Sequence, residues 1–197
     1  MKDNQRVVEF PNWFASTPAQ ENFTNMLAPF KGQPNLNFLQ LGAYTGDASV
    51  WLMDNILTDS TSTLTDIDTW EGSQEVAHKS IDFNQVYNFY KNRTEKYNNC
   101  YHHRLTTWQY LRFHPDDFVY DFIYIDADHT AVGTLLDAEL SWDLLRVGGL
   151  LAFDDYEWNA GKGEEFNPGP GINTFLARHQ GQYRVIHKGW QVWIIKG

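Results

Sequence analysis

Residues 120–156 decide the fold of this chain, and they read YDFIYIDADHTAVGTLLDAELSWDLLRVGGLLAFDDY. The stretch holds two short apolar runs, at 122–125 and 150–153, and each leads directly into carboxylates. Between them, leucines recur at helical spacing up to Gly148-Gly149, which predicts a helix joining two strands. Parallel strands joined in this way end at the same edge of a sheet, where open α/β folds bind ligands. We therefore expect five side chains to meet at that edge: Asp126, Asp128, His129, Asp154 and Asp155.

The composition is that of one compact domain. The chain has 197 residues, of which 42% are hydrophobic, enough for a sizeable core. Its single cysteine, Cys100, excludes an internal disulfide and a cysteine-based metal site, and it fits a reducing compartment. The net charge of −10, without a block of Lys or Arg, weighs against a nucleic-acid partner. The amino-terminal residues contain no apolar signal segment, and no run approaches membrane-spanning length, so we expect a cytoplasmic protein with no membrane partner.

Three segments outside the opening stretch are predicted to cover the sheet. Residues 1–35 are interrupted by prolines and should form a helical or irregular cover with one short helix at 18–27, before a single domain at 36–197. Residues 71–100 favour a helix after a loop at 71–73. Residues 157–171 are dense in Gly and Pro and are expected to be a lid over the carboxylates.

A glycine turn follows the first predicted strand. The apolar run at 36–41 leads into Gly42-Ala43-Tyr44-Thr45-Gly46 and then into a helical pattern at 47–57. Such a turn brings backbone N–H groups and a helix N-terminus up to a ligand. The G-x-x-x-G spacing is neither the dinucleotide fingerprint nor a P-loop. A tight strand-to-helix turn without a ligand is the alternative interpretation.

The second and third predicted strands add polar groups to the same edge. The strand at 62–70 contains Asp68, 22 positions after Gly46, a separation typical of an acid that binds a ribose in α/β nucleoside-binding folds. Asp66 is the second candidate for that role. Thr107 follows the third strand, expected at 101–107, and precedes a short helix toward residue 113. The runs at 183–187 and 190–195 predict a carboxy-terminal hairpin.

The combination resembles the class I S-adenosylmethionine-dependent methyltransferases from about residue 36 to 195. The motifs that carry the resemblance are FLQLGAYTGDAS, LTDIDTW, YDFIYIDADH and LLRVGGLLAFDDY. It implies an α/β fold with a Rossmann-like, seven-stranded, mostly parallel sheet, helices on both faces and an antiparallel carboxy-terminal hairpin. It also implies S-adenosylmethionine as the cofactor, held by a set of residues at the strand ends: Gln40, Gly42, Ala43, Tyr44, Gly46, Asp68, Thr69, Trp70, Thr107 and Asp126. Gln40 departs from the acid that many relatives carry at this position, and an amide cannot offer the same charge to the cofactor's ammonium group.

Within this family, IDADH followed by FDDY looks most like small-molecule O-methyltransferases, some of which depend on a metal. The resemblance implies that Asp126 and His129 are catalytic, with His129 as the base. It implies Asp126, Asp154 and Asp155 as ligands of a divalent cation such as Mg²⁺, with metal dependence left open. The alternatives are that Asp128 and Asp155 only cap local turns and that His129 is a solvated loop residue.

The expected function is methyl transfer from S-adenosylmethionine to a hydroxyl of a small polar acceptor, such as a sugar or a polyhydroxylated compound. A catalytically silent module that binds the cofactor or a nucleoside is one alternative, and a methyltransferase for another acceptor class is a second. A nucleic-acid N-methyltransferase is disfavoured because residues 153–156 read FDDY and lack the Asn/Asp-Pro-Pro-aromatic pattern. Homo-oligomerisation stays open.

Overall fold

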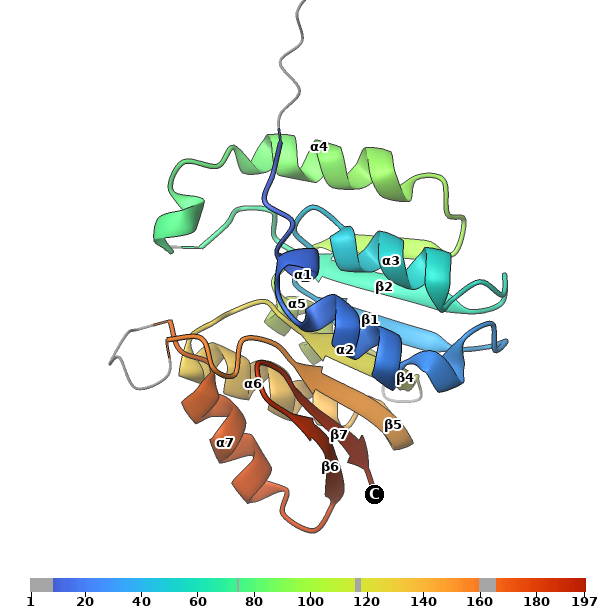
Figure 1. Cartoon of the computed structure of the whole chain (residues 1–197), viewed down its shortest axis with the longest axis vertical. Helices are drawn as coiled ribbons and strands as arrows, with labels where there is room; N and C mark the ends of the chain where they lie inside the picture. Colours follow the sequence, from blue (N-terminus) through green and yellow to red (C-terminus); the bar gives the residue numbers. More distant parts are fainter. Residues whose placement is uncertain (1–8, 74, 116–117, 160–165) are drawn as a thin grey trace, which may run out of the picture.

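A computed structural model describes residues 9–73, 75–115, 118–159 and 166–197. Its centre is a seven-stranded sheet of order β3-β2-β1-β4-β5-β7-β6 (Figure 1). The strands are β1 (Asn37–Leu41), β2 (Thr63–Asp68), β3 (Cys100–Arg104), β4 (Tyr120–Ile125), β5 (Leu145–Phe153), β6 (Tyr183–Lys188) and β7 (Val192–Lys196). The α-helices are α1 (Trp13–Ser16), α2 (Ala19–Met26), α3 (Asp47–Asn55), α4 (Phe83–Thr94), α5 (Thr107–Arg112), α6 (Ala131–Trp142) and α7 (Gly169–Arg178), and the short 3₁₀ helices are η1 (Ala28–Phe30) and η2 (Val76–His78).

The strand directions confirm the predicted fold class. β3, β2, β1, β4 and β5 pair in parallel, and β7 is antiparallel to both β5 and β6. The parallel strands are joined by helices, as parallel connections require. The carboxyl ends of β1, β2, β4 and β5 therefore lie at one edge of the sheet, at the left in Figure 1.

Side chains that alternate along each strand build a separate core on each face of the sheet. Phe38 points to the core shared with α2 and α3, whereas its neighbour Leu39 points to the core shared with α5, α6 and α7. On the first face, Phe23 of α2 is fully buried, and its ring lies 4.9 Å from Tyr124 and 5.4 Å from Trp193. The helix predicted at 18–27 is thus present and packs on the sheet.

The prediction for the end of α6 was wrong. The helix stops at Trp142, and β5 already begins at Leu145, although the leucine spacing continues the helical period. Tyr120 pairs with Leu145 but Phe122 pairs with Leu150, so the extra residues of β5 form a bulge that contains Gly148 with φ +76°. The predicted carboxy-terminal hairpin is present, but its second strand begins two residues later than predicted. β7 starts at Val192, and Trp190 lies in the turn.

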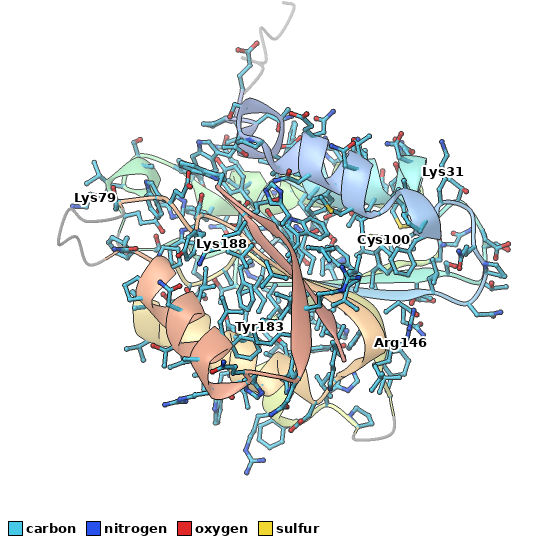
Figure 2. The ribbon with its side chains drawn as sticks, turned by 60° about the horizontal axis from the view of Figure 1, so that its bottom comes forward. Lys31, Lys79, Cys100, Arg146, Tyr183 and Lys188 are labelled. Atoms are coloured by element: carbon cyan, nitrogen blue, oxygen red, sulfur yellow. The ribbon has the colours of Figure 1, made fainter. Side chains whose placement is uncertain are left out.

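Two further segments lie at the carboxyl edge of the sheet. The segment 75–82 with η2 and the residues that follow β5 are both found there in Figure 1. Lys79 marks this end of the molecule in Figure 2, and Lys31 and Arg146 mark the opposite end. Within the described ranges, no helix has the length and apolar character needed to cross a membrane.

Candidate active site

The glycine turn after β1 touches the end of β4. Gly42 has φ +87°, and a Cβ atom built there would lie 1.8 Å from the carbonyl oxygen of Asp126. Only glycine allows both this backbone conformation and this close approach. The predicted cofactor turn and the first predicted catalytic residue are therefore immediate neighbours.

Asp68 fixes the shape of the turn. Its Oδ2 accepts hydrogen bonds of 2.8 Å from the backbone N–H groups of Ala43 and Tyr44, and its Oδ1 accepts one of 2.7 Å from Trp70. A carboxylate has about four acceptor positions, so capacity for a ribose hydroxyl remains. The ribose-binding role of Asp68 stays a prediction, and the structure adds a second role in which this side chain joins two strand ends.

Aromatic side chains surround the turn. Tyr44, with φ +46°, stacks on Trp13 at a centroid distance of 4.7 Å and faces His78 at 6.4 Å. Burial raises the pKa of Tyr44 to about 12. The indole of Trp70 is 1% exposed, and its Nε1 donates to the carbonyl of Tyr44 at 2.8 Å. Trp70 is buried as a whole, and the cofactor contact that the resemblance implies for it stays a prediction.

The remaining predicted cofactor residues lie on the same edge. Gln40 is 2% exposed, and its Nε2 donates to the carbonyl of Gly42 at 2.8 Å, so the amide supports the turn from below. Gly46, with φ +76°, is the N-cap residue of α3. Thr69 accepts a hydrogen bond from the N–H of Glu71, and the hydroxyl of Thr107 donates to the buried carboxylate of Asp137 at 2.5 Å.

His129 lies at the centre of a cluster of carboxylates. Its Nδ1 is 3.1 Å from Glu75, and its Nε2 is 3.2 Å from Asp126 and 3.6 Å from Asp155. The ring of Trp158 meets the imidazole edge to face at 5.2 Å. Burial alone would lower the pKa of His129, but the hydrogen bonds to Asp126 and Glu75 and the nearby negative charges outweigh it and raise that pKa well above its usual value.

The two acids after β5 face different directions. Asp155, with φ +56°, points toward His129 and Asp126. Asp154 accepts hydrogen bonds from the hydroxyl of Tyr124 and from the N–H of Asp155. The same hydroxyl lies 3.3 Å from Oδ2 of Asp126 and therefore sits between two carboxylates. Burial and mutual repulsion raise the pKa of Asp126, Asp154 and Asp155 to about 6.

The structure thus brings Asp126, His129 and Asp155 together as expected and turns Asp154 toward Tyr124. Asp128 is exposed and accepts a hydrogen bond from the N–H of Thr130, which matches the alternative that it caps a turn. Sequence reasoning missed Glu75, which is 7% exposed and reaches His129 across 54 residues. The only sequence signal for it was an acid in the segment after the second strand.

The parallel sheet, the glycine turn at β1 and the acid at the end of β2 define a class I S-adenosylmethionine-dependent methyltransferase. A family model described as "Methyltransferase domain" matches residues 39–156, which is more than half of the chain. The chain belongs to this family. A comparison with curated proteins found no match.

Solved structures share the fold at low sequence identity. An O-methyltransferase from Bacillus cereus in complex with SAH has a TM-score of 0.62 and 18% identity, over 91% of this chain and 82% of that one. The N-methyltransferase NodS from Bradyrhizobium japonicum, also in complex with SAH, has a TM-score of 0.61 and 14% identity, over 96% of this chain and 93% of that one. An rRNA methylase from Streptococcus thermophilus has a TM-score of 0.64 and 12% identity, over 91% and 96%. The fold is therefore common to methyltransferases of different acceptor classes.

Proposed function

We propose that this chain transfers the methyl group of S-adenosylmethionine to a hydroxyl oxygen of a small polar acceptor, such as a sugar or another polyhydroxylated compound. The contact between Gly42 and the backbone of Asp126 is the observation that carries this proposal, because it sets the cofactor turn beside the carboxylate–imidazole cluster. A sulfonium methyl group is already electrophilic. The protein's tasks are therefore to align the acceptor oxygen with the methyl group and to remove the hydroxyl proton.

Each member of the cluster has a task in this reaction. Glu75 holds the imidazole of His129 through Nδ1, which leaves Nε2 directed at Asp126 and Asp155. The acceptor hydroxyl binds between these groups and gives its proton to Nε2 of His129 as the methyl group passes from sulfur to oxygen. Because the carboxylates favour the imidazolium form, the rate should rise with pH as His129 loses its proton.

The donor set fits a divalent cation. Asp126, His129 and Asp155 each offer one ligand atom, and these atoms lie within 4.8 Å of one another. The two carboxylates suit Mg²⁺ or Mn²⁺, and a cation held by them would stabilise the charge that develops on the acceptor oxygen while Nε2 of His129 stays free to take the proton. Asp154, the other predicted ligand, would have to turn away from Tyr124 to take part.

The surroundings of the cluster favour an uncharged or cationic acceptor. In the part of the chain that the structure describes, no lysine or arginine forms an ion pair or hydrogen bond with Glu75, Asp126, Asp154 or Asp155. A phosphate or carboxylate group would therefore be repelled. Trp158 offers an aromatic face beside His129 against which a sugar or phenol ring could pack.

Two measurements test the proposal. Calorimetry with S-adenosylmethionine and its demethylated product tests cofactor binding, and no heat at millimolar ligand would contradict it. Formation of S-adenosylhomocysteine is then followed with sugars, catechols and a short RNA, each with Mg²⁺, Mn²⁺ or chelator. Turnover with a sugar or catechol supports the proposal. Turnover with RNA alone assigns another acceptor class, and binding without any turnover favours a silent module.

A further inference from the structure

A layer of buried polar side chains lies beneath the glycine turn. It consists of Gln40 on β1, Ser49 on α3, Asp66 on β2 and Tyr90 on α4, and none of the four is more than 2% exposed. Gln40 and Asp66 are register partners in the parallel pair β1–β2. The proposed proton transfer makes no use of Asp66, yet burying a carboxyl group costs free energy unless its contacts offset the loss of water.

Asp66 accepts hydrogen bonds from two neighbouring elements. Its Oδ2 accepts one of 2.7 Å from the hydroxyl of Tyr90, and Cys100 Sγ lies 3.9 Å from the same atom. The hydroxyl of Ser49 also lies beside the carboxyl group and acts to lower its pKa. Among the described residues, Oδ1 has no hydrogen-bond partner in this arrangement. The carboxyl group therefore has an unused, buried acceptor position.

The contacts of this layer reach both ends of the glycine turn. The ring of Tyr90 lies so close to Gly46 that a Cβ atom built there would be 2.8 Å from Cδ2 of the ring. On the other side, the hydroxyl of Ser49 donates to Gln40 at 3.5 Å, and Gln40 donates to the carbonyl of Gly42 at 2.8 Å. A change at Asp66 is thus transmitted to the turn through two short paths.

We propose that Asp66 is a positioning residue of the cofactor site. Acting through Tyr90 and Ser49, it holds Gly42 and Gly46 in the arrangement that receives S-adenosylmethionine, and its ionised form holds them more firmly than its protonated form. An ionised carboxylate accepts from the hydroxyl of Tyr90 through a charge-assisted bond, which is about twice as strong as a neutral one. Its negative charge beneath the turn also favours a cofactor that carries ammonium and sulfonium groups.

The surroundings of Asp66 place its charge change in the neutral range. Burial, with a contribution from the charge of Asp68, raises the pKa of Asp66 to about 7 against the opposing hydrogen bonds of Ser49, Tyr90 and Cys100. In the described part of the chain, no cation acts on this pKa. The titratable groups that face this carboxyl group from the elements packed against it are Asp68, Tyr90, Cys100 and His102, and His102 is the register partner of Asp66 in the pair β2–β3. Cofactor affinity should therefore rise with pH, and binding near pH 7 should release a proton.

Calorimetric titration with S-adenosylhomocysteine from pH 5.5 to 8.5 tests this inference. Wild-type affinity should rise roughly tenfold relative to that of Asp66→Asn across this range, and the wild type should release more protons on binding than Asp66→Asn when buffers of different ionisation enthalpy are compared. Tyr90→Phe keeps the ring against Gly46 but removes the hydroxyl, and it should weaken binding at pH 8. Asp121→Asn, at the opposite end of β4 where Asp121 pairs with Arg146, should keep the wild-type profile.

The comparison between variants is the decisive quantity, because Asp126, Asp154 and Asp155 titrate in every one of them. An Asp66→Asn profile and proton release identical to those of the wild type would overturn the inference. If Asp66→Asn does not fold, as circular dichroism would show, Tyr90→Phe decides instead, and unchanged affinity at pH 8 overturns it. The readout is cofactor binding alone, so it stands or falls separately from the choice of acceptor.

Discussion

Asp126 contacts both the glycine turn and the carboxylate–imidazole cluster, through different atoms. Its carbonyl oxygen abuts Gly42 in the glycine turn, and its carboxylate lies 3.2 Å from Nε2 of His129. In the proposed reaction, the backbone of this residue would belong to the cofactor site and its side chain to the acceptor site. Any acceptor held by the side chain is necessarily close to the cofactor.

Replacing this carboxylate should stop the reaction without unfolding the protein. Asp126→Asn keeps the backbone contact and the size of the side chain but removes the charge that orients the acceptor and His129, so turnover should fall roughly 100-fold or more. Steady-state kinetics and thermal unfolding measure the two quantities. Asp128→Asn is the matched control from the same loop, because asparagine keeps the capping bond to Thr130. Equal activity of both variants would refute the role of Asp126.

Glu75 should act on the reaction through His129. Glu75→Gln removes a negative charge that stabilises the imidazolium, so the pKa of His129 should fall and the pH–rate profile should move to lower pH. The maximal rate should also drop roughly tenfold because the ring is held less firmly. The exposed neighbour Glu71→Gln provides the control. A pH–rate profile of kcat/KM that does not move in Glu75→Gln contradicts this role.

Part of the site could be predicted from the sequence, because strand ends bring their residues to one edge. This reasoning placed Asp126, His129 and Asp155 together. It could not find Glu75, since its contact depends on the path of an irregular segment with no periodic pattern. Nor could it show that Asp154 turns toward Tyr124, because adjacent residues after a strand differ in direction only through backbone angles such as the φ of +56° at Asp155.

At the level of elements, the turn between β1 and α3 depends on the close approach of Gly42 to β4. Gly42→Ala should destabilise the fold by roughly 3 kcal/mol and abolish cofactor binding, because the new Cβ atom would collide with backbone. Gly181→Ala is a matched control with φ +86° and no atom within 4 Å of the new Cβ, so it should cost only about 1 kcal/mol. Chemical denaturation measures both. Similar losses in the two variants would show that the contact with Asp126 is not important.

The element boundaries show where sequence periodicity stops being informative. The succession of strands and helices along the chain could be predicted, because each parallel strand carries an apolar run and each connecting helix carries an apolar face. The boundary between α6 and β5 was not, since Leu144 and Leu145 satisfy both the helical period and the start of a strand. Only the pairing of Leu145 with Tyr120, a tertiary contact, decides between them.

For the whole molecule, stability should fall as the pH rises from about 4 to about 7. Asp66 and Asp137 are buried, and burial raises the pKa of each to about 7, whereas an unfolded chain loses these protons near pH 4. The folded state therefore binds more protons across this window, and rising pH favours unfolding by up to about 1.4 kcal/mol per pH unit for each group. Asp137→Asn should reduce this slope. Urea unfolding at pH 5 and pH 8 measures the change in the free energy of unfolding between these pH values. An equal change in the wild type and in Asp137→Asn would contradict the prediction.

The stacking of Trp13 on Tyr44 gives the chain a built-in optical reporter. A cofactor that settles on the turn must change the surroundings of the Tyr44 ring and, through it, the emission of an indole that is 38% exposed. Titration with S-adenosylhomocysteine should therefore change the intrinsic fluorescence without any label. The chain has eight tryptophans, so Trp13→Phe identifies the source of the signal. If the change persists in that variant, the N-terminal helix does not sense the ligand.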